Sequence, residues 1–249
     1  MKLIKDLVLG FADAENYKRR ENKELLNRVF IRDAHLDSLC EPNVSFLVGE
    51  KGTGKTAYSI YLSNNNYKET ISNIRYIRET EYQKFISLKR EKHLSLSDFS
   101  SIWKVILYLL ISKQVMDKEG VISHLLNYSK FDALNSAIDE YYLNAFSPEI
   151  IQALSFVQES KVVAELLSKY AKLKGEEKEA LTFSESRFQI NLFYIQKKFE
   201  LAFSQIKLKQ NHILFIDGID IRPSSIPYDE YLECIKGLAN AVWLSLIHI

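Results

Sequence analysis

The stretch Gly49–Thr56 reads GEKGTGKT, and it decides the fold that the rest of the chain is expected to adopt. It matches the pattern G-x-x-x-x-G-K-[ST]. The apolar run Val44–Val48 precedes it and predicts a strand, whereas Ala57–Leu62 follows it and can continue as a helix. Strand, glycine-rich turn and helix form the context that a phosphate-binding loop requires. A chance match in an ordinary turn is the alternative, with a frequency of about 1% in a chain of average composition.

Each part of this loop has an expected role in binding phosphate. Glycines permit backbone conformations that other residues resist, so that consecutive N–H groups converge on an anion beside a helix N-terminus. Lys55 supplies a positive charge for the β- and γ-phosphates, and the hydroxyl of Thr56 is expected to coordinate Mg²⁺. The residues expected to bind the nucleotide are Gly49, Glu50, Lys51, Gly52, Thr53, Gly54, Lys55, Thr56 and Ala57.

A second chemical element lies far downstream, at His212–Asp217. Its mainly apolar residues lead into Asp217, a pattern that indicates a buried parallel strand with a carboxylate at its C-terminal end. Ligands of open α/β sheets sit beyond such ends, so Asp217 is expected to orient Mg²⁺ near Lys55 and Thr56, as the Walker B acid does. Asp220 follows. In a functional role, Asp220 would polarise the attacking water or complete the metal shell. In a structural role, it would be an N-cap or turn acid. The functional and the structural interpretation both stay open.

Together these elements define the predicted site. The catalytic candidates are Lys55, Asp217 and Asp220, the metal ligands are Thr56 and Asp217, and the expected cofactors are ATP and Mg²⁺. The long interval between the loop and Asp217 leaves room for an extra strand, as in the additional-strand class of ATPases. Guanine-nucleotide proteins need a D-x-x-G soon after the loop and an N-K-x-D. The sequence has neither, so adenine is the preferred base.

The interval between the two elements is mainly helical in pattern. Thr70–Ile77 is rich in β-branched residues and predicts the second strand. Ser97 is the expected N-cap of a helix that is apolar on all sides from Val105 to Ile111, and is therefore buried. Residues from about 112 to 178 exceed a normal connection and predict a large helical insertion. A capping-box pattern at Thr182–Glu185 begins a further long helix.

The C-terminal part is expected to form a helix, Tyr228–Asn240, followed by the opening of another strand, Ala241–Trp243. The last six residues, LSLIHI at 244–249, match what the transposon mosaic-end adapter of sequencing libraries encodes in frame. We interpret them as an artefact to be excluded from fold reasoning. Residues 1–243 are then expected to be an incomplete P-loop ATPase domain of a longer protein.

Composition sets broader limits. The chain has 249 residues, 47% hydrophobic and 26% charged, which suits one large α/β domain with an insertion. Its net charge of +1 favours neither nucleic acid nor a membrane, although a cluster such as Lys89–His93 keeps nucleic acid open as a partner. The N-terminus does not resemble a signal peptide, and the longest apolar run, Val105–Ile111, is too short to span a bilayer. Cys40 and Cys234 are expected to be buried free thiols in a cytoplasmic protein.

With both elements in place, the chain resembles the AAA-type and STAND-type P-loop ATPases. It is most similar to a bacterial branch with a GxKGTGKT-like loop and a strand ending D-G-[LI]-D, which here are Gly49–Thr56 and Asp217–Asp220. Phe30–Leu39 is also similar to the F-x-G-R-E-x-x-x-L box that precedes the loop in STAND proteins, although its glycine is missing. The expected contact with the nucleotide base falls on Phe30 or Ile31, for which core packing is the alternative role.

This resemblance implies a P-loop NTPase fold of three αβα layers, with a parallel sheet ordered 5-1-4-3-2 whose strand 5 is missing here. It implies ATP hydrolysis coupled to conformational change or assembly, in phage defence or signalling, with a homo-oligomer or effector as partner and no membrane. The alternative is a nucleotide-dependent scaffold or switch with little hydrolysis, because Gly218 stands where many such ATPases carry a catalytic glutamate. A phosphotransferase would need an acceptor pocket and a lid, of which the sequence gives no sign.

Overall fold

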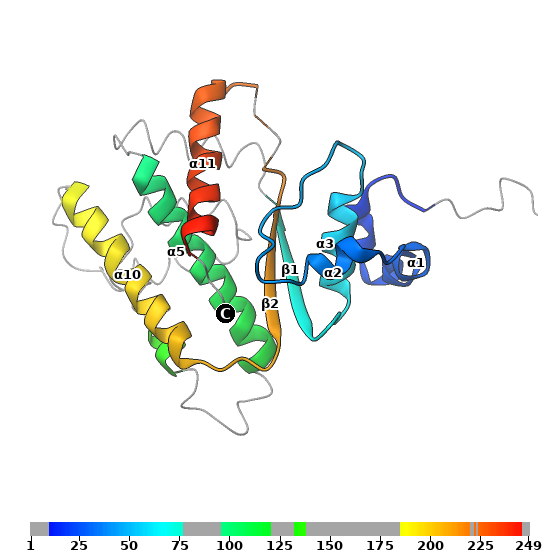
Figure 1. Cartoon of the computed structure of the whole chain (residues 1–249), viewed down its shortest axis with the longest axis horizontal. Coiled ribbons are helices and arrows are strands. Elements are labelled where there is room, and N and C mark those ends of the chain that lie inside the picture. Colours follow the sequence, from blue (N-terminus) through cyan, green and yellow to red (C-terminus); the bar gives the residue numbers. More distant parts are fainter. Residues whose placement is uncertain are drawn as a thin grey trace, which may run out of the picture. The chain divides into compact units, whose positions relative to one another are not determined.

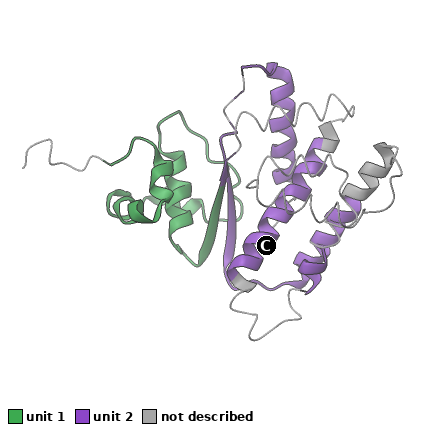
Figure 2. Ribbon diagram, turned by 180° about the vertical axis from the view of Figure 1, so that it is seen from behind, with its two compact units in different colours: residues 1–74 green, residues 75–249 purple. Residues whose placement is uncertain are grey.

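The computed structural model describes residues 10–76, 96–120, 132–137, 185–219, 222 and 224–245. The chain divides into two compact units, Met1–Ile74 and Arg75–Ile249 (Figure 2). The broad prediction of a mixed α/β protein with parallel strands is confirmed, whereas the five-stranded order stays a prediction.

The first unit consists of short helices that pack around the helix following the glycine-rich loop (Figure 1). In chain order its helices are η2 (Ala14–Lys18), η3 (Arg20–Asn22), α1 (Lys23–Val29), α2 (Ala34–Ser38) and α3 (Lys55–Asn64). The second half of α3 is buried through Ile60, Tyr61 and Leu62. Asn27 and Asn65 exchange side-chain amide hydrogen bonds of 3.1 and 2.9 Å, which tie α1 to the C-terminal end of α3.

Two strands are present among the described residues, and both lie where the sequence predicts strands. They are β1 (Thr70–Tyr76) and β2 (Asn211–Asp217), which are neighbours in a parallel sheet. In β1, Thr70, Ser72 and Ile74 are buried and alternate with half-buried residues. This period of two is typical of a strand with one covered face.

The predicted strand Val44–Val48 is wrong in this structure. Residues 44–50 have no regular secondary structure, and the side chains of Val44, Phe46 and Val48 are exposed. An extended segment becomes a strand only where a neighbour supplies backbone hydrogen bonds, and neither described strand pairs with this one. The apolar run is therefore present without a ladder of hydrogen bonds.

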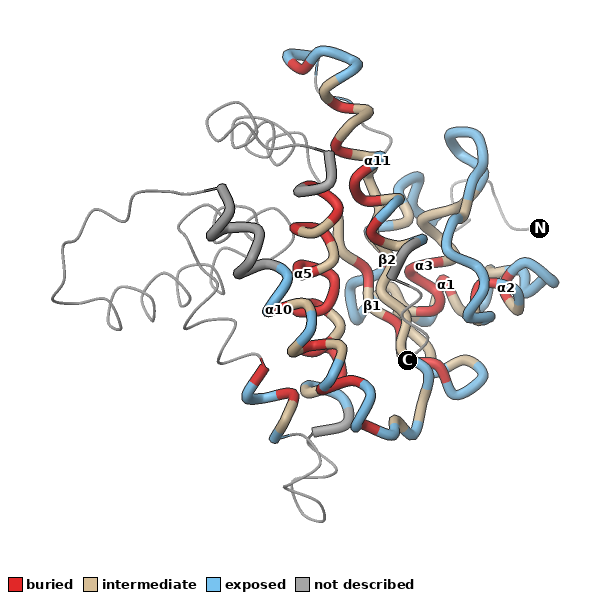
Figure 3. The backbone as a smooth tube through the Cα atoms, turned by 60° about the vertical axis from the view of Figure 1, so that its left-hand side comes forward, coloured by how far each residue is buried: buried red, intermediate tan, exposed pale blue. Residues whose placement is uncertain are grey.

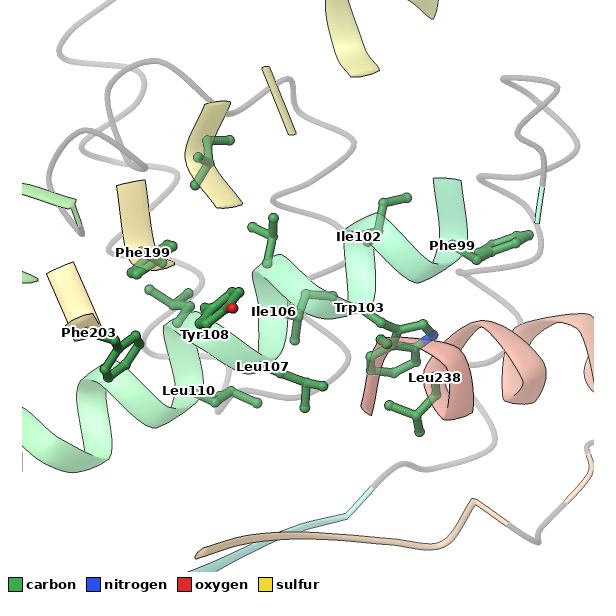
Figure 4. Close-up of a cluster of buried hydrophobic side chains, with 14 of the residues drawn as sticks. Phe99, Ile102, Trp103, Ile106, Leu107, Tyr108, Leu110, Phe199, Phe203 and Leu238 are labelled. Atoms are coloured by element: carbon green, nitrogen blue, oxygen red, sulfur yellow. The ribbon is translucent and has the colours of Figure 1, made fainter. Parts of the chain in front are cut away.

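The second unit is built around one buried helix, α5 (Leu96–Val115) (Figure 4). Its other elements are the π-helix η4 (Met116–Gly120), a helical segment at 132–137, α10 (Glu185–Gln205), β2 and α11 (Tyr228–Ser245). Helices α10 and α11 both contact α5, as does β2. Tyr108 of α5 stacks with Phe199 and Phe203 of α10, with centroids 5.8 Å apart in each pair, and Leu238 of α11 joins the same core cluster.

Burial explains the strongly apolar composition of α5 (Figure 3). Among the described residues, one helical stretch is long and apolar enough to cross a membrane: Phe99–Lys118, with 20 residues and a mean hydropathy of 1.2. In this structure 67% of it is buried inside the protein, against α10, α11 and β2. The prediction of a buried core helix is confirmed.

Helix α11 overturns a second prediction, because Ala241–Trp243 continue the helix and do not open a strand. Cys234, Leu238 and Ala241 are buried at helical spacing and form one apolar stripe in the core that α5 shares. Ala241 belongs to this stripe. Its helical conformation follows from packing that a short apolar run does not reveal.

Other predictions lie outside the described residues. These are most of the insertion at 112–178, the capping-box residues 182–184, the cluster Lys89–His93 and residues 246–249. Both cysteines are free thiols; Cys234 is buried as predicted, and Cys40 is half-buried.

Candidate functional site

The glycine-rich loop has the backbone conformation that its sequence predicts. Gly52 and Gly54 have φ angles of +89° and +88°, in the left-handed region that L-residues avoid. The backbone N–H and the hydroxyl of Thr53 both donate to the carbonyl oxygen of Glu50, at 3.3 and 2.8 Å. The turn is therefore closed by its own residues, before any ligand binds.

The ammonium group of Lys55 lies over this turn. Its Nζ donates to the carbonyl oxygen of Gly49 at 2.6 Å and to that of Glu50 at 2.9 Å. An ammonium has three N–H donors, so these two bonds hold it in place and leave one for a ligand oxygen. The positive charge is thus fixed over the carbonyl oxygens of the turn.

Helix α3 begins within the loop, at Lys55, and Gly54 is its N-cap. Gly54 has no side chain with which to cap the first turn. The start of a helix, at the positive end of the helix dipole, is in general an anion-binding position. Thr56 lies in this turn, and its carbonyl oxygen accepts a 2.9 Å hydrogen bond from the hydroxyl of Ser59. The predicted phosphate-binding residues therefore form one continuous arrangement.

The segment ahead of the loop packs on α3 through aromatic rings. Phe30 stacks on Tyr61 with centroids 4.2 Å apart, and it meets Tyr58 edge-on at 5.3 Å. Arg32 places its Cζ 5.7 Å from the centroid of the Tyr61 ring. Ile31, between these two anchored neighbours, has 81% of its surface exposed. Of the two candidates for the base contact, Phe30 is used in packing and Ile31 is accessible to a ligand.

Asp33 joins α2 to α3. Its Oδ1 accepts hydrogen bonds from the backbone N–H groups of His35 and Leu36, at 3.1 and 3.2 Å, and so caps α2. Its Oδ2 accepts a 2.7 Å hydrogen bond from the hydroxyl of Tyr58, which is the main reason that the pKa of Asp33 is lowered. This pair could not be predicted from the sequence. The acid ahead of α2 is an N-cap signal, but no local pattern points to Tyr58.

Asp217 is the last residue of β2 and is half-buried. Its Oδ1 accepts a 2.8 Å hydrogen bond from the backbone N–H of Gly218, whose φ is +84°. A glutamate in this left-handed turn would be strained, so the backbone conformation accounts for a glycine at this position. Asp220 lies outside the described residues.

Thr56 belongs to the first unit and Asp217 to the second, where Asp217 stands at the end of its strand. Among the described residues, no group of three or more His, Cys, Asp and Glu side chains could hold a metal ion. Mg²⁺ commonly binds through one or two carboxylates together with water and substrate phosphates, which needs no such group. Thr56 and Asp217 therefore stay the predicted ligands.

Comparison of the chain with protein-family models, with curated proteins and with solved structures finds no significant match.

Proposed function

We propose that this protein binds ATP with Mg²⁺ and hydrolyses it to ADP and phosphate. The geometry of the loop carries the proposal. Gly52 and Gly54 are left-handed, α3 begins at Lys55 without a side-chain cap, and the Lys55 ammonium is bonded to the loop carbonyls. Converging N–H donors and a fixed positive charge are what a triphosphate needs.

The arrangement of the two strands supports the same proposal. β1 is the strand that follows the loop helix, β2 is the strand that ends at Asp217, and the two are neighbours. In a sheet ordered 5-1-4-3-2, the strand after the loop helix is strand 2 and the Walker B strand is strand 3. Strands 2 and 3 are neighbours in that order, as β1 and β2 are in this structure.

The proposed reaction is attack by water on the γ-phosphorus, with cleavage of its bond to the β,γ-bridging oxygen and release of ADP. Lys55 neutralises charge on the β- and γ-phosphate oxygens, and Ile31 contacts the base. Thr56 and Asp217 would hold Mg²⁺, which would supply positive charge against the charge that develops on the phosphate oxygens. Asp220 accepts the proton of the attacking water.

A second candidate is a nucleotide-dependent switch with little hydrolysis, which Gly218 favours because its left-handed turn excludes an unstrained glutamate beside Asp217. ATP binding would then drive conformational change or assembly without turnover. In either case we place the protein in the cytoplasm, with a second copy or an effector protein as partner. A role in phage defence or signalling rests on the resemblance alone.

The test measures nucleotide binding and phosphate release separately on the full chain. A fluorescent ATP analogue is bound with Mg²⁺ and displaced by ATP or GTP, and ATP is expected to compete better. Lys55→Ala should weaken binding at least about tenfold, which is about 1.4 kcal/mol. Lys51→Ala is the matched control, because Lys51 is expected to contribute through its backbone N–H, which the substitution keeps, while its exposed side chain is removed. Asp217→Asn should abolish the Mg²⁺-dependent part of the affinity.

Each outcome decides between the candidates. Folded wild-type protein that binds no nucleotide would refute both. Binding without phosphate release, even in concentrated protein, would leave the switch and exclude the hydrolase. Equal losses of nucleotide affinity in Lys55→Ala and Lys51→Ala would contradict the role assigned to the side chain of Lys55.

A further inference from the structure

Helix α10 carries aromatic and basic side chains on the side opposite its core face. Its inner face, which belongs to the core cluster shared with α5, consists of Ile195, Phe199, Ala202 and Phe203. On the other side, Phe193, Tyr194 and Leu201 have exposed fractions of 61%, 42% and 58%. Figure 3 shows buried and exposed residues alternating along this helix.

Two lysines complete the exposed side, each one turn beyond a ring. Nζ of Lys197 lies 5.6 Å from the ring centroid of Phe193, and Nζ of Lys198 lies 5.4 Å from that of Tyr194. Both pairs have i,i+4 spacing, so they form two parallel rows in which an ammonium follows a ring. These four residues, Phe193, Tyr194, Lys197 and Lys198, are called the α10 outer face.

The region around this face is positively charged. From residue 193 to residue 209 the sequence has four lysines (Lys197, Lys198, Lys207 and Lys209) and one acid (Glu200), a local net charge of +3 in a chain of +1. Burial acts to raise the pKa of Glu200, but hydrogen bonds from Gln196 and Lys197, at 2.7 and 2.6 Å, lower it overall. The single acid is therefore ionised and paired within the helix, and the region as a whole attracts anions.

We propose that the α10 outer face binds single-stranded nucleic acid. Exposed rings are stacking platforms for bases of any sequence, because every base has a π-face, and neighbouring ammonium groups pair with the phosphates. Two rows of ring and ammonium match a polymer in which flat bases alternate with anionic phosphates. The proposal is independent of ATP binding, since none of these residues lies in the nucleotide loop.

A lipid surface fits the α10 outer face less well. A helix that lies on a membrane inserts a continuous apolar face between the lipids. In α10 that face is already buried in the core with α5. From Phe193 to Gln205, where the side chains of α10 are described, Leu201 is the one large aliphatic side chain that is exposed.

The experiment measures fluorescence anisotropy of a labelled oligo(dT) strand with the full chain at several salt concentrations. Wild type should bind it, with an affinity that falls as salt rises. Phe193→Ala/Tyr194→Ala should weaken binding about tenfold or more, from the loss of two stacking platforms. Lys197→Gln/Lys198→Gln should weaken it and reduce the slope of log affinity against log salt by about 0.7, from the phosphate contact of Lys198, because Lys197 is paired with Glu200.

Tyr228→Ala is the matched control, because Tyr228 is a 60% exposed aromatic residue in the same unit, outside this face. Absence of binding by wild type, an equal loss in Tyr228→Ala, or binding to phosphatidylserine vesicles without binding to the oligonucleotide would each overturn the proposal. The lysine pair leaves both aromatic rings in place, so it keeps the test decisive if the aromatic variant is unstable. Lys55→Ala should leave oligonucleotide binding unchanged, which separates this proposal from ATP binding.

Discussion

The hydroxyl of Tyr58 donates a 2.7 Å hydrogen bond to Oδ2 of Asp33, so the first turn of the loop helix is tied to the residue that caps α2. Tyr58 follows Lys55 by one turn on α3, and Asp33 follows Ile31 closely in the preceding segment. The bond therefore couples the phosphate loop to the segment that we propose to contact the base.

Tyr58→Phe tests this coupling. The variant keeps the ring that meets Phe30 edge-on and removes only the hydroxyl that bonds to Asp33. We expect a few-fold loss of ATP affinity, because the segment carrying Ile31 is no longer held against α3. The pKa of Asp33 should also rise toward its usual value, since the Tyr58 hydrogen bond is the largest cause of its lowering. Nucleotide titration and NMR of the carboxyl group measure the two effects.

Tyr67→Phe is the control for that prediction. It removes a similar bond, from the Tyr67 hydroxyl to Oδ1 of Asp37 at 2.6 Å, away from the start of α3. Its effect on ATP affinity should be negligible. Equal losses of affinity in the two variants would show that the Tyr58 bond has no special role.

Gly54 should resist substitution for a conformational reason. Its φ is +88°, and a Cβ added there would meet no atom within 4 Å, so any cost comes from the backbone alone. We expect Gly54→Ala to lower the free energy of unfolding by about 1–2 kcal/mol, with a larger loss for valine and a smaller one for asparagine, which tolerates this region best. Urea unfolding of the alanine, valine and asparagine variants measures the order of their stabilities. A valine variant as stable as the asparagine variant would contradict it.

Tyr108 should make stability depend on alkaline pH. Burial, aided by the charge of Glu200, raises its pKa from the usual 10.0 to about 12. Because the folded-state pKa is the higher one, the neutral phenol stabilises the fold below about pH 10, and this contribution is lost as the pH rises from about 10 to about 12. Urea midpoints across this range should fall more steeply for wild type than for Tyr108→Phe, which keeps the ring stacked on Phe199. Parallel falls would exclude Tyr108 as the cause.

Several features of the fold could be predicted because their causes are local in sequence. The loop conformation depends on the positions of Gly52 and Gly54, and helix α3 starts where Lys55 follows them. The end of β2 is marked by apolar residues that lead into Asp217. The burial of α5 follows from a helix that is apolar on all sides, since no surface helix tolerates that composition.

The tertiary structure decided what depends on distant partners. Val44–Val48 has a strand-like sequence but no neighbour to complete its hydrogen bonds, and Ala241 is helical because it extends a stripe that packs in the α5 core. Tyr58 meets Asp33 only because Phe30 brings the preceding segment against α3. Sequence by itself therefore determined the chemistry of the loop and the type of most elements. Pairing, which requires a second segment to supply donors or apolar surface, determined which strands form and which faces stay exposed.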